Sequence, residues 1–173
     1  KQPQFEYLMP HFPGYSLGYA AEGTVLQFNL NYADFQKLAP KSPSKYDDQF
    51  IALMIQAYGQ ASGYYGNWLM QTWDYGGCSQ LGKGIHLKLL KEIQTQMNRK
   101  SPFSSELTAL RERILKDALE WKWMCQSRMS VHSELEAIFK DIKLSPKERQ
   151  GLKVRLNLEG AEFSCLTQAC SMG

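Results

Sequence analysis

The sequence contains no run of about 18 consecutive apolar residues, the length that a membrane-spanning helix needs, so we expect no transmembrane segment. It also contains no G-x-S-x-G motif, no Walker A motif and no dinucleotide-binding fingerprint. No two cysteines form a C-x-x-C pair, which argues against a zinc ribbon or a thioredoxin-type site. Because no motif predicts chemistry, we expect a protein without a metal ion or a cofactor.

The excess of charge of one sign is small: the 173 residues carry a net charge of only +3. This small charge, with no nucleic-acid-binding motif, argues against a nucleic-acid partner. Histidine is scarce as well, and His11, His86 and His132 show no metal-ligand spacing. His132 begins an H-x-E triplet like that of zinc deaminases, but the P-C-x-x-C of those enzymes is absent. We therefore expect His132 to be a surface residue in the first turn of a helix.

Proline is rare in the second part of the chain, since five of the seven prolines precede residue 45. This distribution excludes a long helix from the N-terminal segment and permits helices after it. The hydrophobic fraction of 43% predicts a packed core. We predict a mainly α single domain over 1–173: an extended, aromatic-rich N-terminal arm over 1–43, packed on the body, and a helical core of four to five helices over 44–173.

At most one short β pairing is expected. Residues 26–32 alternate apolar and polar side chains, as a strand does. Residues 151–160 are ambiguous, because Leu152, Val154 and Leu156 alternate like a strand that could pair with 26–32, whereas the preceding Ser145-Pro146-Lys147-Glu148 is a strong helix start. We favour the helix.

The remaining helices are predicted from capping residues and from apolar spacing. One helix begins at Ser44 and ends near Trp73; the others cover residues 84–99, begin at Ser101-Pro102, begin at Ser130 and begin at Ser145. In the helix that follows Ser101, charges at i,i+4 spacing, including Arg113 and Asp117, predict a solvent-facing side.

Three glycines, Gly59, Gly63 and Gly66, fall on one side of the first predicted helix, although each costs about 1 kcal/mol there. The favoured interpretation is a smooth groove that seats a neighbouring segment. The alternatives are a ligand cleft with aromatic walls, and a bend in the helix. The aromatic walls of such a cleft would include Tyr58, Tyr64, Tyr65 and Trp68.

Four cysteines, Cys78, Cys125, Cys165 and Cys170, predict either two disulfides in an exported protein or four free thiols in a cytosolic one. We favour disulfides and export, because the chain begins without methionine, as it would after removal of a signal peptide. If Cys165 and Cys170 share a helix, five residues turn them about 140° apart. They would then pair with Cys78 and Cys125 rather than with each other.

The glycine-rich loop at 74–86 is the one place where chemistry is conceivable. Its glycines and Cys78 are similar to the calcium loop of secreted phospholipases A2, in which a carboxylate such as Asp74 would take part. The histidine–aspartate pair of that family is missing, since His86 precedes Leu87. A small secreted hydrolase with a site in this loop is our alternative, and an ordinary interhelical loop is the favoured interpretation.

The main candidate site is a basic segment between residues 83 and 100, where five cations against Glu92 alone give a charge of +4. An amphipathic basic helix of this kind binds an anionic lipid surface or an acidic protein; the competing interpretation is an ordinary solvated face. We therefore predict a secreted or periplasmic, non-enzymatic binding protein, such as an effector. Its candidate binding residues are Lys83, His86, Lys88, Lys91, Arg99, Lys100, Tyr64, Tyr65 and Trp68.

Overall fold

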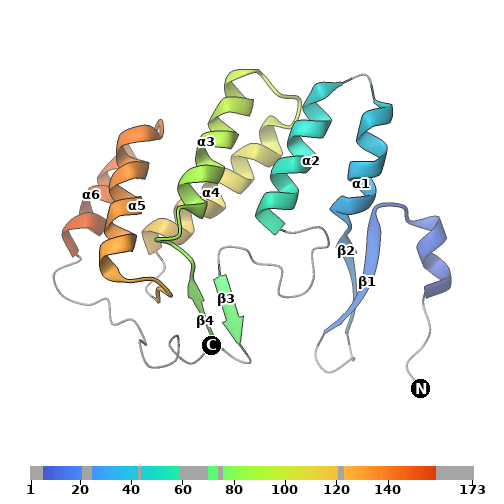
Figure 1. Cartoon of the computed structure of the whole chain (residues 1–173), viewed down its shortest axis with the longest axis horizontal. Coiled ribbons are helices and arrows are strands. Elements are labelled where there is room, and N and C mark those ends of the chain that lie inside the picture. Colours follow the sequence, from blue (N-terminus) through green and yellow to red (C-terminus); the bar gives the residue numbers. More distant parts are fainter. Residues whose placement is uncertain are drawn as a thin grey trace. The chain divides into compact units, whose positions relative to one another are not determined.

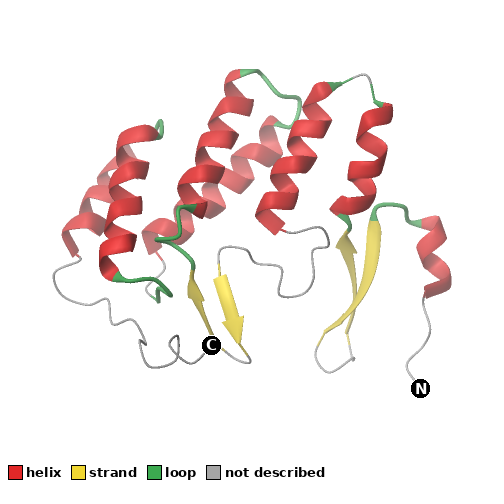
Figure 2. Cartoon of the chain, in the orientation of Figure 1, coloured by secondary structure: helices red, strands yellow, loops and turns green. Residues whose placement is uncertain are grey.

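The computed structural model describes residues 6–20, 25–42, 44–58, 70–73, 76–120 and 123–158. The chain divides into two compact units, Lys1–Trp68 and Leu69–Gly173, and each is described by itself. The described residues are mainly helical and form six α-helices and two two-stranded sheets (Figures 1 and 2). The mainly α class is confirmed, with one helix and one β pairing more than expected.

The first unit combines a β-hairpin with two helices. Its elements are a 3₁₀ helix Glu6–His11, β1 Tyr15–Ala20, β2 Val25–Leu30, α1 Tyr32–Leu38, a 3₁₀ turn Ala39–Lys41 and α2 Lys45–Tyr58. The predicted strand is confirmed as β2, but its partner is the antiparallel β1, with Tyr15 opposite Leu30. The segment expected to be an extended arm therefore contains regular structure of its own, and α1 packs against α2.

Two local features shape the first unit. Gly14 has φ +84, and a Cβ at this position would collide with the ring of Phe35, so the close approach of α1 requires glycine. Ser44 caps α2, because its Oγ accepts a hydrogen bond from the amide of Tyr46 at 3.2 Å. The reciprocal half of the predicted capping box is replaced, since the Ser44 amide donates to Ser42 Oγ.

The second unit contains four helices and a short hairpin. Its elements are β3 Met70–Trp73, β4 Gly76–Ser79, α3 Ile85–Asn98, α4 Ser104–Glu120, α5 Arg128–Asp141 and α6 Pro146–Leu158. Helix α3 packs against α4 and α5, and α6 packs against the same two helices. Their shared interior is aliphatic and includes the fully buried Leu89, Ile93, Leu107, Ile114, Leu135, Ile138 and Leu152. Within the described ranges, no helix is both long and apolar enough to span a membrane.

The helix starts follow their capping residues. At α6, the Ser145 amide donates to Glu148 Oε2 at 2.7 Å and the Glu148 amide donates to Ser145 Oγ at 3.3 Å, which confirms the predicted capping box. Residues 151–158 continue this helix, so the helical interpretation is confirmed. Helix α5 is capped by Ser127 rather than Ser130, whose amide is the donor to Ser127 Oγ.

The long helix predicted to run from Ser44 to about Trp73 is wrong at its end. The described helix ends at Tyr58, and Met70–Trp73 is a strand whose backbone pairs with β4, placing Trp73 opposite Gly76. The three glycines at 59, 63 and 66, with Tyr64, Tyr65 and Trp68, lie outside the described residues.

A disulfide joins Cys78 in β4 to Cys125, which follows α4, with their Cα atoms 5.2 Å apart. The prediction of disulfides is confirmed for this bond. The predicted pairing is wrong, because Cys78 and Cys125 bond to each other and so neither is available to Cys165 or Cys170. Those last two cysteines lie outside the described residues.

Candidate functional site

The glycine-rich loop before α3 is held by a carboxylate from α5. Glu134 is buried, and its two oxygens accept hydrogen bonds from the amides of Gly82, Gly84 at 2.9 Å and Leu87 at 3.0 Å. These amides include donors that a helix start leaves unsatisfied, and a carboxylate also complements the helix dipole there. Two positions in this loop favour glycine, because Gly82 and Gly84 have φ of +101 and +79, in the left-handed region.

A buried polar cluster lies beside this loop. Asp117 Oδ2 accepts a hydrogen bond of 2.5 Å from the Ser79 hydroxyl and lies 2.8 Å from His86 Nε2. Ser79 and His86 are fully buried, and Asp117 is 8% exposed. The predicted solvent-facing side of α4 is therefore wrong at Asp117, which points into the interior. His86 was predicted to belong to the binding surface, and its burial removes it from that surface.

The cluster bears on the hydrolase alternative. The fold does provide a histidine–aspartate pair, but the aspartate comes from α4 and not from the residue after His86. A serine nucleophile needs its hydroxyl within reach of the imidazole and of a substrate, whereas the Ser79 hydroxyl bonds to Asp117 in the interior. The loop residues Asp74 and Tyr75 lie outside the described residues. Among the residues that are described, no three His, Cys, Asp or Glu side chains are grouped to hold a metal ion.

The basic segment is spread along the exposed side of α3. Lys88 and Lys91 are one turn apart and exposed, whereas Arg99 and Lys100 follow the end of the helix. Lys83 lies before the helix and donates to Gln80 Oε1 at 3.0 Å. Because fourteen helical residues rise about 21 Å, the five cations do not form one compact patch.

The end of α5 and the residues that follow it bring further cations to the middle of α3. Lys91 Nζ lies 2.7 Å from Asp141 Oδ2, and the Lys143 amide donates to Gln94 Oε1 at 2.8 Å. The hydrogen bond from Lys91 lowers the pKa of Asp141, and the charges of Lys91 and Lys140 lower it further. The structure thus places Lys140 and Lys143 close to the α3 cations.

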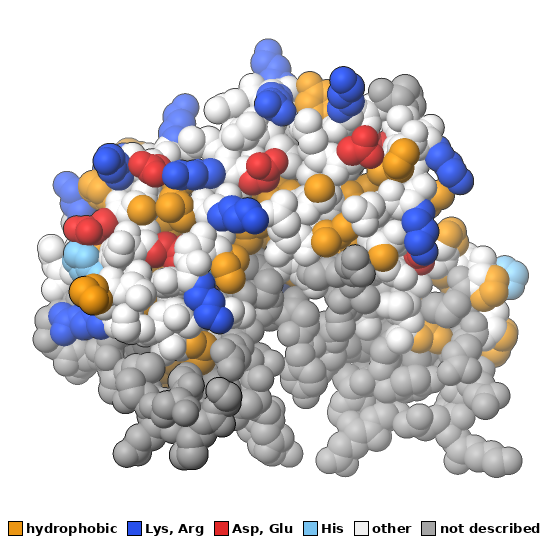
Figure 3. All heavy atoms as spheres, in the orientation of Figure 1, with side chains coloured by type: hydrophobic (Ala, Val, Ile, Leu, Met, Phe, Trp, Pro, Cys, Tyr) orange, Lys and Arg blue, Asp and Glu red, His pale blue; other side chains and the backbone are white. Residues whose placement is uncertain are grey.

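We call Lys88, Lys91, Lys140 and Lys143 the basic face; all four are exposed. Figure 3 shows blue side chains gathered over α3 and α5, with fewer red ones among them. Asp141 pairs with Lys91, so one cation of the basic face is matched by a carboxylate, and Glu136 lies 3.5 Å from His132. Lys140 and Lys143 were missed by the sequence analysis, because only packing brings the end of α5 beside α3.

Two groups of exposed apolar side chains were also missed. In the first unit, Phe12, Tyr15 and Phe28 line a hollow of about 290 Å³, with the rings of Phe12 and Phe28 5.6 Å apart. In the second unit, Trp123 and Met129 are exposed near the start of α5. Neither group has periodic spacing in the sequence. The first is brought together by the β1–β2 hairpin, and the second lies where the chain enters α5.

The comparisons with known proteins give no additional site residues. No protein-family model, no curated protein and no solved structure matches this chain.

Proposed function

We propose that this chain is an exported, non-enzymatic binding protein whose basic face engages an anionic macromolecular surface. The observation that carries the proposal is the convergence of Lys88 and Lys91 with Lys140, at the end of α5, and Lys143, which follows α5. Two contacts fix this convergence, the Lys91–Asp141 ion pair and the bond from the Lys143 amide to Gln94. Because these contacts already hold the two segments together, binding a partner requires little further ordering of this surface.

Export is supported by the Cys78–Cys125 bond, since disulfides persist in oxidising compartments and are rare in the cytosol. The test is the intact mass of protein prepared without reductant, before and after alkylation. We expect no alkylation of Cys78 or Cys125. Alkylation of all four cysteines in freshly prepared protein would contradict export.

The binding proposal is tested by reversing charge on the basic face. Lys88→Glu combined with Lys143→Glu leaves the Lys91–Asp141 pair in place. Each lysine near an anionic membrane contributes about 1 kcal/mol, so removing two and adding repulsion should weaken binding by tens-fold or more. The probes are vesicles containing phosphatidylserine and, separately, polyglutamate. Binding should also weaken with added salt, because exposed charges are screened over about 8 Å at physiological ionic strength.

A matched control separates the basic face from the bulk charge. Lys116→Glu combined with Lys153→Glu changes the net charge by the same amount at exposed positions on α4 and α6. We expect this control to bind far more tightly than the basic-face variant. Equal losses in both variants, or binding that is indifferent to salt, would contradict the proposal.

A further inference from the structure

Residues 123–129, which lead into α5 and are called the turn below, hold two large apolar side chains out in solvent. Trp123 is 55% exposed, and Met129, in the first turn of α5, is 82% exposed. Tryptophan, methionine and arginine are enriched at binding surfaces. The position of these side chains is therefore a candidate contact surface distinct from the basic face.

The turn is held in place by several bonds. The Ser79 amide donates to the Trp123 carbonyl at 2.7 Å, and the Cys125 amide donates to the Ser79 carbonyl at 2.9 Å. The disulfide from Cys125 to Cys78 adds a covalent link to the same strand. Ser127 then caps α5. These contacts hold the backbone at Trp123, at Cys125 and at the start of α5.

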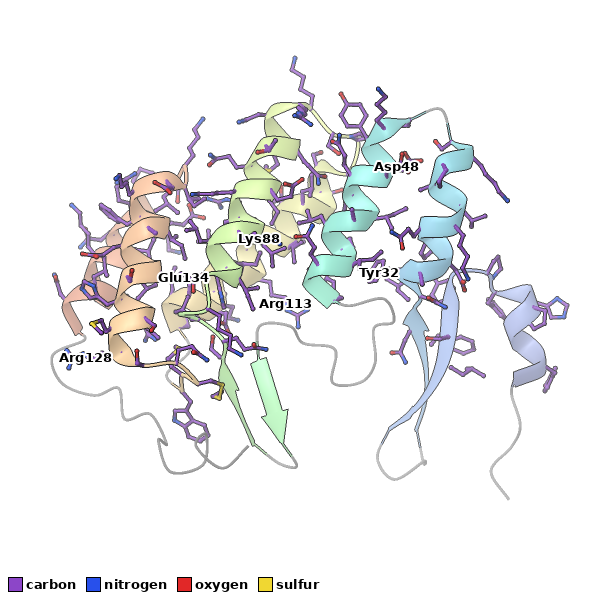
Figure 4. The ribbon with its side chains drawn as sticks, in the orientation of Figure 1. Tyr32, Asp48, Lys88, Arg113, Arg128 and Glu134 are labelled. Atoms are coloured by element: carbon purple, nitrogen blue, oxygen red, sulfur yellow. A yellow bond between two sulfur atoms is a disulfide. The ribbon has the colours of Figure 1, made fainter. Side chains whose placement is uncertain are left out.

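One cation is adjacent to Met129 in the sequence, and a second is carried by the loop that contacts the turn. Arg128 precedes Met129 and is exposed; Figure 4 shows it at the start of α5. Lys83 is carried by the glycine-rich loop, which lies against the turn, since a Cβ on Gly82 would meet Gln126. The nearby carboxylate of Glu134 is engaged by the loop amides and adds no exposed negative charge. The turn thus combines apolar bulk with positive charge.

We infer that this turn inserts into the interfacial layer of an anionic lipid bilayer, with Trp123 and Met129 among the acyl-chain ends and Arg128 and Lys83 at the phosphates. Tryptophan favours the membrane–water interface, and basic residues are attracted to anionic headgroups. The Met129 side chain is almost fully exposed, so it is available to pack among lipid acyl chains. This inference rests on the proposed function and names a lipid bilayer as its anionic surface.

The experiment uses the full chain and vesicles of phosphatidylcholine with and without phosphatidylserine. Trp123→Ala combined with Met129→Ala should weaken binding to the anionic vesicles about tenfold, which is about 1.4 kcal/mol. Met97→Ala is the matched control, because Met97 is exposed at the opposite end of α3, and it should bind like the unaltered protein. Brominated lipids should quench tryptophan fluorescence, and Trp123→Phe should remove most of that quenching.

The outcomes separate this inference from the proposed function. Unaltered affinity in the Trp123/Met129 variant, while the basic-face reversal still abolishes vesicle binding, would overturn insertion and leave the basic face standing. Binding to polyglutamate but not to anionic vesicles at low salt would overturn the lipid partner alone. Binding to neither probe would overturn both proposals. Circular dichroism of each variant verifies that a loss of binding is not a loss of fold.

Discussion

Replacing Glu148 with glutamine should destabilise the protein at neutral pH and have much less effect in acid. The side chain of Glu148 accepts hydrogen bonds from both terminal nitrogens of Arg111, at 2.6 and 3.0 Å, which joins α6 to α4. Arg111 also donates to the Lys143 carbonyl at 2.9 Å. Glu148→Gln keeps the size of the side chain but removes the negative charge and one of the two acceptor oxygens, so the change measures the ion pair at this junction.

The magnitude follows from the pKa of Glu148. Hydrogen bonding from Arg111, with further bonds from Ser145, lowers this pKa from 4.5 to about 2, against the opposing effect of burial. At about 1.4 kcal/mol for each pKa unit, the upper limit on the stabilisation is about 3 kcal/mol. The side chain is 22% exposed, and partial solvation reduces the effect. We therefore expect a loss of about 2 kcal/mol.

The pH dependence has a definite sign. Because the folded pKa lies below the unfolded value, the stabilisation is complete above pH 4.5 and is lost as the pH falls toward about 2. Urea unfolding of the two proteins at neutral pH and at about pH 3 measures the difference. Glu112→Gln, an exposed change on the same helix as Arg111, is the control and should have little effect. A difference between Glu148→Gln and the unaltered protein that is equally large at both pH values would refute the reasoning.

Three further predictions concern the second unit. Reduction of the Cys78–Cys125 bond should lower the free energy of unfolding by up to about 4 kcal/mol, since the bond spans 47 residues; urea unfolding at an unchanged midpoint would contradict this. Glu134→Ala should destabilise by about 2–4 kcal/mol, because three amides lose their acceptor, and hydrogen exchange at Gly84 should accelerate; retained protection would argue against the contact. Asp117→Asn should lower the melting temperature by weakening two buried hydrogen bonds, and a melting temperature equal to that of the unaltered protein would show that the negative charge contributes nothing.

Local signals in the sequence predicted much of the helical structure. The apolar spacing over residues 84–99 corresponds to α3, and Ser145 with Glu148 marks the start of α6. These predictions succeed because capping bonds join residues three positions apart and because apolar periodicity is itself the condition for burying one face of a helix. The strand over 26–32 was found for the same reason, although its partner was not.

Predictions that depended on contacts between residues distant in the sequence were less accurate. The helix expected to reach Trp73 gives way to a strand, because Met70–Trp73 pairs with β4 and β4 is tied to Cys125. Asp117 has an i,i+4 neighbour that suggested solvent, but its bonds to Ser79 and His86 place it inside. Sequence spacing carries no information on these partners, which are 31 or more residues away.

The sequence by itself determined that the chain is mainly helical, where most of its described helices start, and that residues 83–100 carry excess positive charge. Only the tertiary structure decided which charges stand together. It buried His86, paired Lys91 with Asp141 and brought Lys143 beside Gln94 on α3. The physical reason is that helix propensity and periodicity are local properties, whereas a surface is assembled from helices whose contacts depend on the packing of the whole unit.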